Sequence, residues 1–326
     1  MKSPFTTARL SLRIRLLSST ALAVVGAVWM ASAGLAQAAP GGSCVTTTPG
    51  GVTTITCDGF TDDQVYAGDD HTVVTLNADA VVSYEDDPAI VLNNSDSSLT
   101  MNADSTAYTY GSRYAVVSDG DRNTITLNDG AAIENTNTLY GDYNYAAVGL
   151  FTETGSDLTL NGGSRIVMNG GTDNSHYDNF SFRGVYAQGQ NIDITLNGAS
   201  TITVYGIGTE GENKYAGVVF LDSSTTASTR SSIVLNGAST VNVIGSYASD
   251  GNDLIGIIAA GQGYSSYTPT VVLNGASSVN VEGHLGTSNN KYIGIEAIGR
   301  DAGVTLNGGS SVNVTGDGGG ANNKYL

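Results

Sequence analysis

The sequence predicts an all-β fold, a right-handed parallel β-helix, for the part of the chain that follows an N-terminal export segment. A phrase centred on Leu-Asn recurs eight times, and each repeat supplies three short strand-like pieces. The composition agrees, because the 326 residues include 43 Gly and many Asn, Ser, Thr and Val, but few long helix-forming side chains. Repetition and composition together indicate a solenoid of about eight irregular three-strand coils.

Residues 1–38 are predicted to be a cleaved secretory signal peptide. Four basic residues within the first fifteen positions precede an apolar run over 16–33, and Ala36, Gln37 and Ala38 form a small-x-small site. A membrane anchor is the alternative, since the apolar run is nearly long enough to span a bilayer. The run is diluted by Ser, Thr and Gly, however, and no basic stop-transfer cluster follows it. Cleavage is therefore expected after Ala38.

The charge of the remaining chain is strongly acidic. All 30 acidic residues follow Ala38, against nine of the 13 basic residues, which gives a net charge of −21. Such an excess argues against binding to nucleic acids or anionic membranes, because both ligands carry the same sign of charge. It favours solubility, and the sequence predicts no cofactor.

Residues 39–60 are predicted to form an N-terminal hairpin that caps the fold. Cys44 and Cys57 are the only cysteines, and β-branched runs flank Pro49, Gly50 and Gly51 between them. In an oxidising export compartment an isolated pair this close is expected to form a disulfide. Closing a loop of about 14 residues contributes about 3 kcal/mol in the chain-entropy model.

The repeats occupy residues 61–326. They are clearest in ITLNGASTITVYG from Ile194, IVLNGASTVNVIG from Ile233 and VVLNGASSVNVEG from Val271, with looser versions before them. Their spacing, from 25 to 39 residues, is typical of solenoids and propellers. A residue repeated in every unit is expected to be structural. The shared asparagines are Asn77, Asn102, Asn128, Asn161, Asn197, Asn236, Asn274 and Asn307.

A third strand-like piece follows a loop of variable length in each unit, as in YNYAAVGLF from Tyr143 and NKYIGIEAI from Asn290. A propeller blade needs four strands in meander order, and that pattern is absent. A parallel β-helix fits, with coils stacked about 4.8 Å apart in a rod of about 40 Å. Alternation within each piece assigns side chains to the core, namely Leu273, Val279, Val281, Ile293 and Ile295.

The corners and faces of the coils also follow from the repeats. Asn-Gly after the first piece suits a corner with positive φ, and the asparagine column is expected to form a hydrogen-bonded ladder along the rod. Tyr145, Tyr215, Tyr292 and Tyr325 recur in the third piece and are expected to stack. Other tyrosines are assigned to loops and are candidates for contacting a glycan or host protein; they are Tyr108, Tyr110, Tyr140, Tyr143, Tyr177, Tyr264 and Tyr267.

The signal segment, the LNGxSxVxVxG repeats and the scarcity of cysteine make the chain similar to the passenger region of bacterial autotransporters, the type V secretion proteins. This resemblance implies a rod carried by the export machinery through the periplasm and across the outer membrane by a C-terminal β-barrel, then displayed at the cell surface or released. No barrel strands are recognisable. The final ANNKYL matches SNNKYI from Ser288, so we expect an incomplete last coil and a missing translocator, as in a fragment, a truncated gene or a split system.

The sequence therefore predicts a non-catalytic adhesin or surface-structural passenger. The alternative is a secreted β-helix enzyme acting on polysaccharide, a lyase or hydrolase, which would need paired carboxylates or a basic partner. Acidic residues cluster at Asp62, Asp63, Asp69, Asp70, Glu85, Asp86 and Asp87, where weak calcium binding stays open. His71, His176 and His284 lie far apart with no partner at metal-ligand spacing, so neither a catalytic nor a metal site is assigned.

Overall fold

The computed structural model describes residues 43–136, 144–170, 181–206, 213–226, 230–246, 251–262, 266–284, 288–316 and 322–326. The chain divides into two units after Ala38, and the following description concerns the second, Ala39–Leu326. The predicted signal peptide and its cleavage site lie outside the described residues. The same is true of His176 and of the predicted loop tyrosines 140, 143, 177 and 264.

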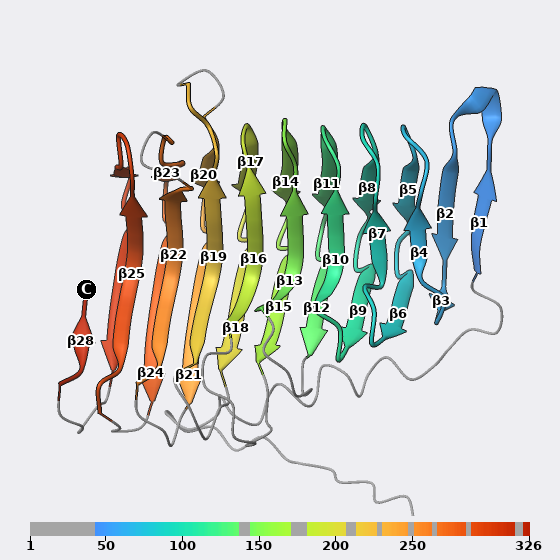
Figure 1. Ribbon diagram of the computed structural model, residues 1–326. Helices are drawn as coiled ribbons and strands as arrows, with labels where there is room; N and C mark the ends of the chain where they lie inside the picture. Colours follow the sequence, from blue (N-terminus) through green and yellow to red (C-terminus); the bar gives the residue numbers. More distant parts are fainter. Residues whose placement is uncertain are drawn as a thin grey trace, which may run out of the picture. The chain divides into compact units, whose positions relative to one another are not determined.

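The described strands form a parallel β-helix with three long sheets, as the repeats predict (Figure 1). Sheet A contains β1 (Ser43–Thr47), β2 (Thr54–Asp58), β5 (Val73–Leu76), β8 (Ser98–Met101), β11 (Asn123–Leu127), β14 (Ser156–Leu160), β17 (Ile192–Leu196), β20 (Ser232–Leu235), β23 (Thr270–Leu273) and β26 (Val304–Leu306). Sheet B contains β3 (Phe60–Thr61), β6 (Val81–Glu85), β9 (Thr106–Tyr110), β12 (Ala132–Thr136), β15 (Arg165–Gly170), β18 (Thr201–Gly206), β21 (Thr240–Ser246), β24 (Ser278–His284) and β27 (Ser311–Gly316).

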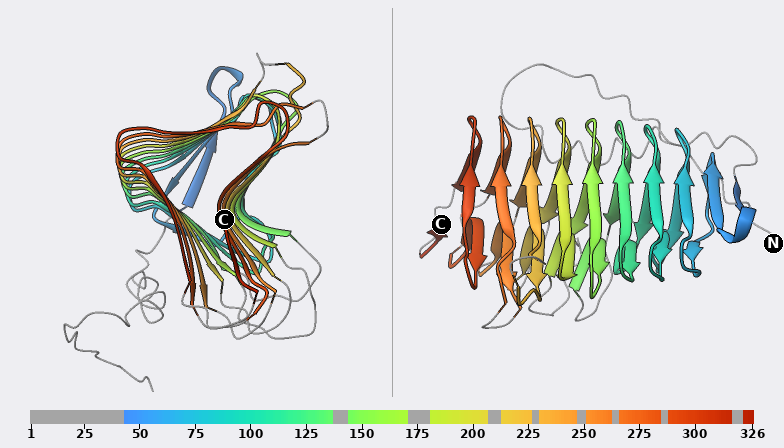
Figure 2. Two further views of the ribbon diagram at one scale, coloured as in Figure 1. Left: turned by 90° about the vertical axis from the view of Figure 1, so that its left-hand side faces the viewer. Right: turned by 90° about the horizontal axis from the view of Figure 1, so that it is seen from above.

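Sheet C completes each coil. It contains β4 (Val65–Ala67), β7 (Ile90–Leu92), β10 (Tyr114–Asp119), β13 (Asn144–Phe151), β16 (Ser181–Gly189), β19 (Lys214–Asp222), β22 (Asp253–Gly261), β25 (Lys291–Ile298) and β28 (Lys324–Tyr325). Seen from the C-terminal end, the strands wind counter-clockwise toward the viewer, so the coil is right-handed (Figure 2). The described coils number nine, because 54–67 forms a coil although it lacks the Leu-Asn phrase.

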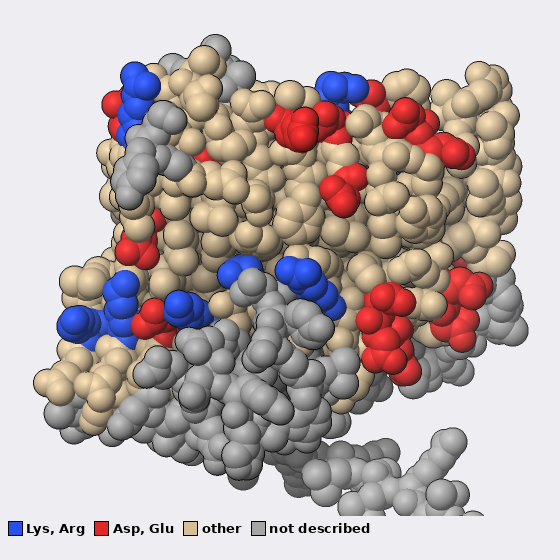
Figure 3. All heavy atoms as spheres, in the orientation of Figure 1, with Lys and Arg blue, Asp and Glu red and all other residues tan. Residues whose placement is uncertain are grey.

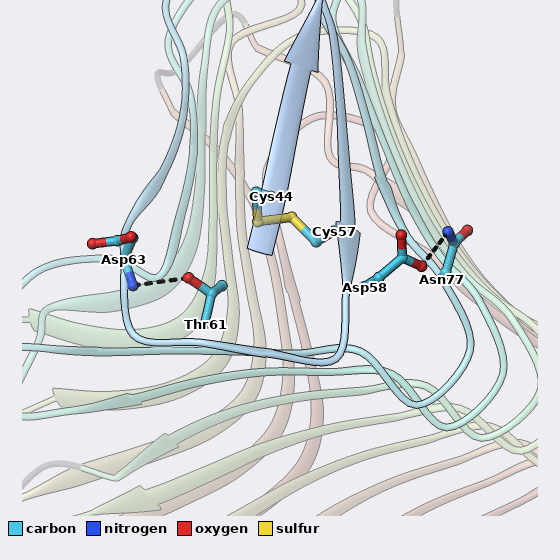
Figure 4. The surroundings of a disulfide bond; sticks show 6 residues. All are labelled: Cys44, Cys57, Asp58, Thr61, Asp63 and Asn77. Carbon is cyan, nitrogen blue, oxygen red and sulfur yellow. Dashed lines mark hydrogen bonds between the residues drawn. A yellow bond between two sulfur atoms is a disulfide. The ribbon is translucent and has the colours of Figure 1, made fainter. Parts of the chain in front are cut away.

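The N-terminal hairpin is built onto sheet A. β1 pairs antiparallel with β2, and β2 pairs in parallel with β5, so β2 belongs both to the hairpin and to the first coil. A 3-10 turn, η2 (Pro49–Gly51), lies between β1 and β2. Cys44 and Cys57 face each other across the hairpin and form a disulfide (Figure 4). Cys57 is 1% exposed and lies in register with Leu76, so the disulfide closes the first end of the core.

The core consists of columns of side chains stacked from coil to coil. Leu196, Leu235 and Leu273 are neighbours in register on adjacent strands of sheet A, and all three are inaccessible to solvent. Three of the four recurring tyrosines, Tyr145, Tyr215 and Tyr292, are buried in this core. Tyr145, Phe182 and Tyr215 stack with ring centroids 5.6 and 5.3 Å apart, and Tyr292 stacks on Tyr325 at 4.9 Å. Burial of these columns stabilises the solenoid by about 1.5–3 kcal/mol per large side chain.

The repeated asparagines lie at the corner between sheets A and B. From Asn128 to Asn307 each side-chain amide is linked to the next, because the Nδ2 atom of one residue donates to the Oδ1 atom of its predecessor at 2.9–3.2 Å. Asn77 instead donates to Asp58 (Figure 4). The glycine that follows has positive φ in the later coils, for example 74° at Gly237, which suits residues without a Cβ. Within the described residues, no helix is long and apolar enough to cross a membrane.

Candidate binding face on sheet C

Sheet C bends because glycines recur near the middle of its strands. A Cβ atom at Gly217, Gly256 or Gly294 would lie 2.1–2.2 Å from a valine of sheet B, so only glycine allows this approach. The bend interrupts the alternation of side chains along the strand. In a straight strand, residues 215 and 217 would both face the core, but in β19 the core residues are Tyr215 and Val218. The outer face of sheet C is therefore concave, as the end-on view shows (Figure 2).

A second hydrophobic cluster fills this concave bend on the outside of the sheet. Ala216, Val219, Ile255 and Ile293 form it, each at most 6% exposed. Tyr186, Leu221 and Ile258 pack against it. Ile293 is buried, as predicted, but it lies in this second cluster and not in the central core, because the bend at Gly294 turns it outward. Ile295 does pack against the central core, and Leu273, Val279 and Val281 are buried in it.

Aromatic side chains continue this cluster toward the N-terminal coils. The rings of Tyr114 and Phe151 meet edge to face with centroids 5.6 Å apart, and Phe151 contacts Tyr186 in the same way. The Arg183 guanidinium lies 4.4 Å from the centroid of the Tyr186 ring, a cation–π contact. Gly149 makes room for the ladder, because a Cβ there would lie 2.9 Å from both Tyr114 and Phe151.

Burial changes the pKa of two groups in this ladder. It raises the pKa of the Tyr114 hydroxyl, against a smaller opposing effect of the nearby Arg113 and Arg183. It lowers the pKa of the Arg183 guanidinium, because burial disfavours the charged form. The guanidinium still carries its charge at neutral pH, because arginine does not lose its proton in proteins. The ladder thus combines a rigid aromatic surface with a fixed positive charge.

Basic side chains gather near the beginnings of the sheet C strands. Five of the nine Lys and Arg residues after Ala38 are here, namely Arg113, Arg183, Lys214, Lys291 and Lys324. Asp253 interrupts the row in β22, and Lys291 pairs with Glu296 at 3.9 Å. Figure 3 shows blue side chains across the left and centre of the lower part of this face, with red ones beside them and at the lower right, and red ones with a few blue ones near the upper edge. Much of the area between is uncharged.

An elongated trough of about 650 Å³ lies at the other end of these strands, at the corner between sheets C and A. Its lining comes from six successive coils, from Ser95 after β7 to Gln262 after β22. Half of the lining residues are polar and uncharged, three carry carboxylates, and one is aromatic, Phe151. The lining side chains that can contact a ligand include Asp119, Asp121, Phe151, Glu153, Gln188, Gln190, Ser223 and Gln262.

Asp121 has a structural role in the wall of this trough. Its Oδ1 accepts hydrogen bonds from Thr152 Oγ1 at 2.7 Å and from the backbone amides of Glu153 and Thr154 at 2.8 and 2.9 Å. Burial alone would raise the pKa of the Asp121 carboxyl, but these hydrogen bonds together lower it below its ordinary value. Asp121 is therefore ionised at neutral pH and holds the turn that begins at Thr152.

The acidic residues singled out in the sequence are spread over several corners. Asp69 accepts a hydrogen bond from Thr53 and Asp70 accepts one from the amide of Ser95. Nowhere in the described ranges do three His, Cys, Asp or Glu side chains come together as metal ligands. His71 lies 3.7 Å from Asp96, and His284 lies 3.1 Å from Glu282.

The assignment of Tyr108 and Tyr110 to loops is wrong. Both lie in β9 of sheet B, because TAYTY alternates and its Ala107 and Thr109 face inward. Among the predicted loop tyrosines in the described part of the chain, only Tyr267 lies outside a strand. Its backbone forms an isolated parallel β-bridge with Arg300. The Arg300 guanidinium is 4.3 Å from its ring centroid.

Sequence reasoning missed the trough and the outer cluster. One signal was present, since Gly184, Gly217, Gly256 and Gly294 recur within the third strand of four units. No pattern in the sequence marked Gln188 or Gln262 as lining residues.

Comparisons with protein-family models, with curated proteins and with solved structures found no match to this chain.

Proposed function

We propose that this chain is an exported, non-catalytic passenger-like rod that acts as an adhesin or surface-structural module, with the outer face of sheet C as its contact surface. The observation that carries the proposal is the alignment of aromatic, amide and basic side chains along that face through successive coils. Because the coils are stacked about 4.8 Å apart, a face built from several of them suits an extended partner that lies along the rod.

Export supports the same function. A small-x-small site that ends at Ala38 and a paired-cysteine hairpin are typical of proteins that fold in an oxidising compartment. The acidic surface keeps such a rod soluble and discourages contact with anionic membranes. The resemblance to autotransporter passengers adds the expectation of display at the cell surface or release from it.

A polysaccharide-cleaving enzyme is the second candidate, since carboxylates of Asp119, Asp121 and Glu153 line the trough. A hydrolase needs one carboxyl group that stays protonated as general acid. Asp121 does not suit that role, because its hydrogen bonds lower its pKa. Binding of a polysaccharide is therefore favoured over its cleavage.

The test is expression of the full chain in a Gram-negative host, followed by fractionation, cell-binding and reducing-end assays. We expect an exported product that begins at Ala39, retains cells or matrix glycans on a coated surface, and releases no reducing ends from polysaccharides. Cytoplasmic retention with residues 1–38 still attached contradicts the export part of the proposal. Sustained release of reducing ends contradicts the non-catalytic part.

A further inference from the structure

We propose that the trough between sheets C and A is a subsite for a neutral, linear oligosaccharide that lies parallel to the axis of the β-helix. The inference rests on the proposed function, since it names the ligand class of the same contact face. It is carried by the shape of the trough, its single aromatic ring and its amide lining.

The shape of the trough fits a chain of sugars better than a compact ligand. Its lining residues come from six successive coils, so it extends over about 24 Å at one strand spacing per coil. Each coil contributes residues from the same corner, so a linear ligand that lies along the axis contacts several coils in turn. The volume of about 650 Å³ is within the range of small-ligand sites.

The aromatic ring provides a fixed apolar surface. Phe151 is held edge to face between Tyr114 and Tyr186, with both centroid distances at 5.6 Å. A ring held in this way loses little conformational freedom when a ligand binds. The C–H face of a pyranose is apolar and can lie on such a ring, while its hydroxyl groups remain at the edge of the sugar.

The polar lining suits hydroxyl groups. The side chains of Gln190 and Gln262 each offer two N–H donors and a carbonyl acceptor, and Ser223 offers a hydroxyl. The Gln188 Oε1 already accepts a hydrogen bond from the Tyr186 hydroxyl at 3.1 Å, which fixes its amide with the N–H donors directed elsewhere. Sugars donate and accept at every hydroxyl and can therefore pair with both the glutamine and the serine side chains.

Charge selects a neutral glycan over an acidic one. Asp119, Asp121 and Glu153 line the trough, and none of its lining residues is Lys or Arg. The basic row lies at the opposite end of the sheet C strands, where Lys214 and Lys291 are first residues. A uronate, a sulfated sugar or a nucleic acid in the trough would place negative charge against ionised carboxylates.

The test is calorimetric titration of the exported full chain with linear neutral hexasaccharides built from glucose, mannose and galactose. Oligogalacturonate, a heparin hexasaccharide and an uncharged hexapeptide are titrated in parallel. We expect binding of at least one neutral hexasaccharide, and weakening by about tenfold in Phe151→Ala and in Gln262→Ala. Gln262→Ala removes only lining atoms, so it remains informative if Phe151→Ala fails to fold.

Two variants serve as controls. Phe151→Tyr keeps the ring and should retain affinity, while Tyr205→Ala removes a half-buried aromatic side chain from sheet B and should leave affinity within about twofold. The inference is overturned if no neutral hexasaccharide binds, if only the anionic sugars or the peptide bind, or if trough and control variants behave alike. If one of these results occurs while the unaltered chain still binds cells, only the proposal about the trough is overturned. If the unaltered chain is not exported or does not bind cells, the proposed function is overturned.

Discussion

At the scale of single residues, two carboxylates on the outer face of sheet A oppose each other. Asp157 of β14 and Asp193 of β17 are direct neighbours in register. Burial first, and then the charge of Asp193, raise the pKa of the Asp157 carboxyl. Because its folded pKa lies above its unfolded value near 3.8, Asp157 binds a proton more tightly in the native state. Its favourable contribution is complete below pH 3.8 and is lost as the pH rises through the folded pKa.

Asp157→Asn should therefore raise the free energy of unfolding at pH 7 by about 0.5 kcal/mol, the size expected for relief of a like-charged cross-strand pair. The midpoint of urea denaturation measures this change. The gain should vanish at low pH, where the Asp157 carboxyl is protonated and no longer repels Asp193. Asp62→Asn, at an exposed turn position, is the matched control and should shift the midpoint little. An unchanged or lower midpoint for Asp157→Asn at pH 7 would show that the pair is not repulsive.

At the scale of the element, the glycine column determines how closely sheet C approaches sheet B. A Cβ at position 256 would lie 2.2 Å from Val279 Cγ1 and 2.4 Å from the carbonyl oxygen of Gly294. Gly256→Ala should lower the free energy of unfolding by about 1–3 kcal/mol or more, because the backbone of the next coil would have to move. Gly303→Ala is the control, since a Cβ there meets no atom within 4 Å. Equal thermal midpoints for the two variants would refute a packing role for Gly256.

The strands themselves were largely predictable at this scale. Alternation in VVLNGASSVNVEG assigned Leu273, Val279 and Val281 to the core, and they are buried. The same reasoning did not predict that Ile293 faces outward, because period-two alternation assumes a straight strand and β25 bends at Gly294. The assignment of Tyr108 to a loop was also wrong, although its strand directly follows the Asn102 repeat, in which Met101 replaces the usual leucine.

At the scale of the whole molecule, the disulfide closes one end of a quasi-one-dimensional stack. Each coil contacts mainly its neighbours, so loss of an end should propagate only a short distance. In Cys44→Ala/Cys57→Ala we expect faster amide hydrogen exchange in β2 to β7 and unchanged exchange in β20 to β25. The free energy of unfolding of the first coils should fall by about 3 kcal/mol or less. Uniformly faster exchange throughout the chain would mean that the stack unfolds as one unit.

The sequence by itself determined the right-handed parallel β-helix, the asparagine corners and the cysteine hairpin. These features depend on local alternation, on turn residues and on a repeat that places equivalent residues in register. Only the tertiary structure decided that sheet C bends, that Ile293 faces outward, and that Phe151 and Gln262 share one trough. Phe151 and Gln262 are 111 positions apart and line the same trough because the coils stack in space. The depth of the trough depends on how the sheets approach each other, which no local pattern encodes.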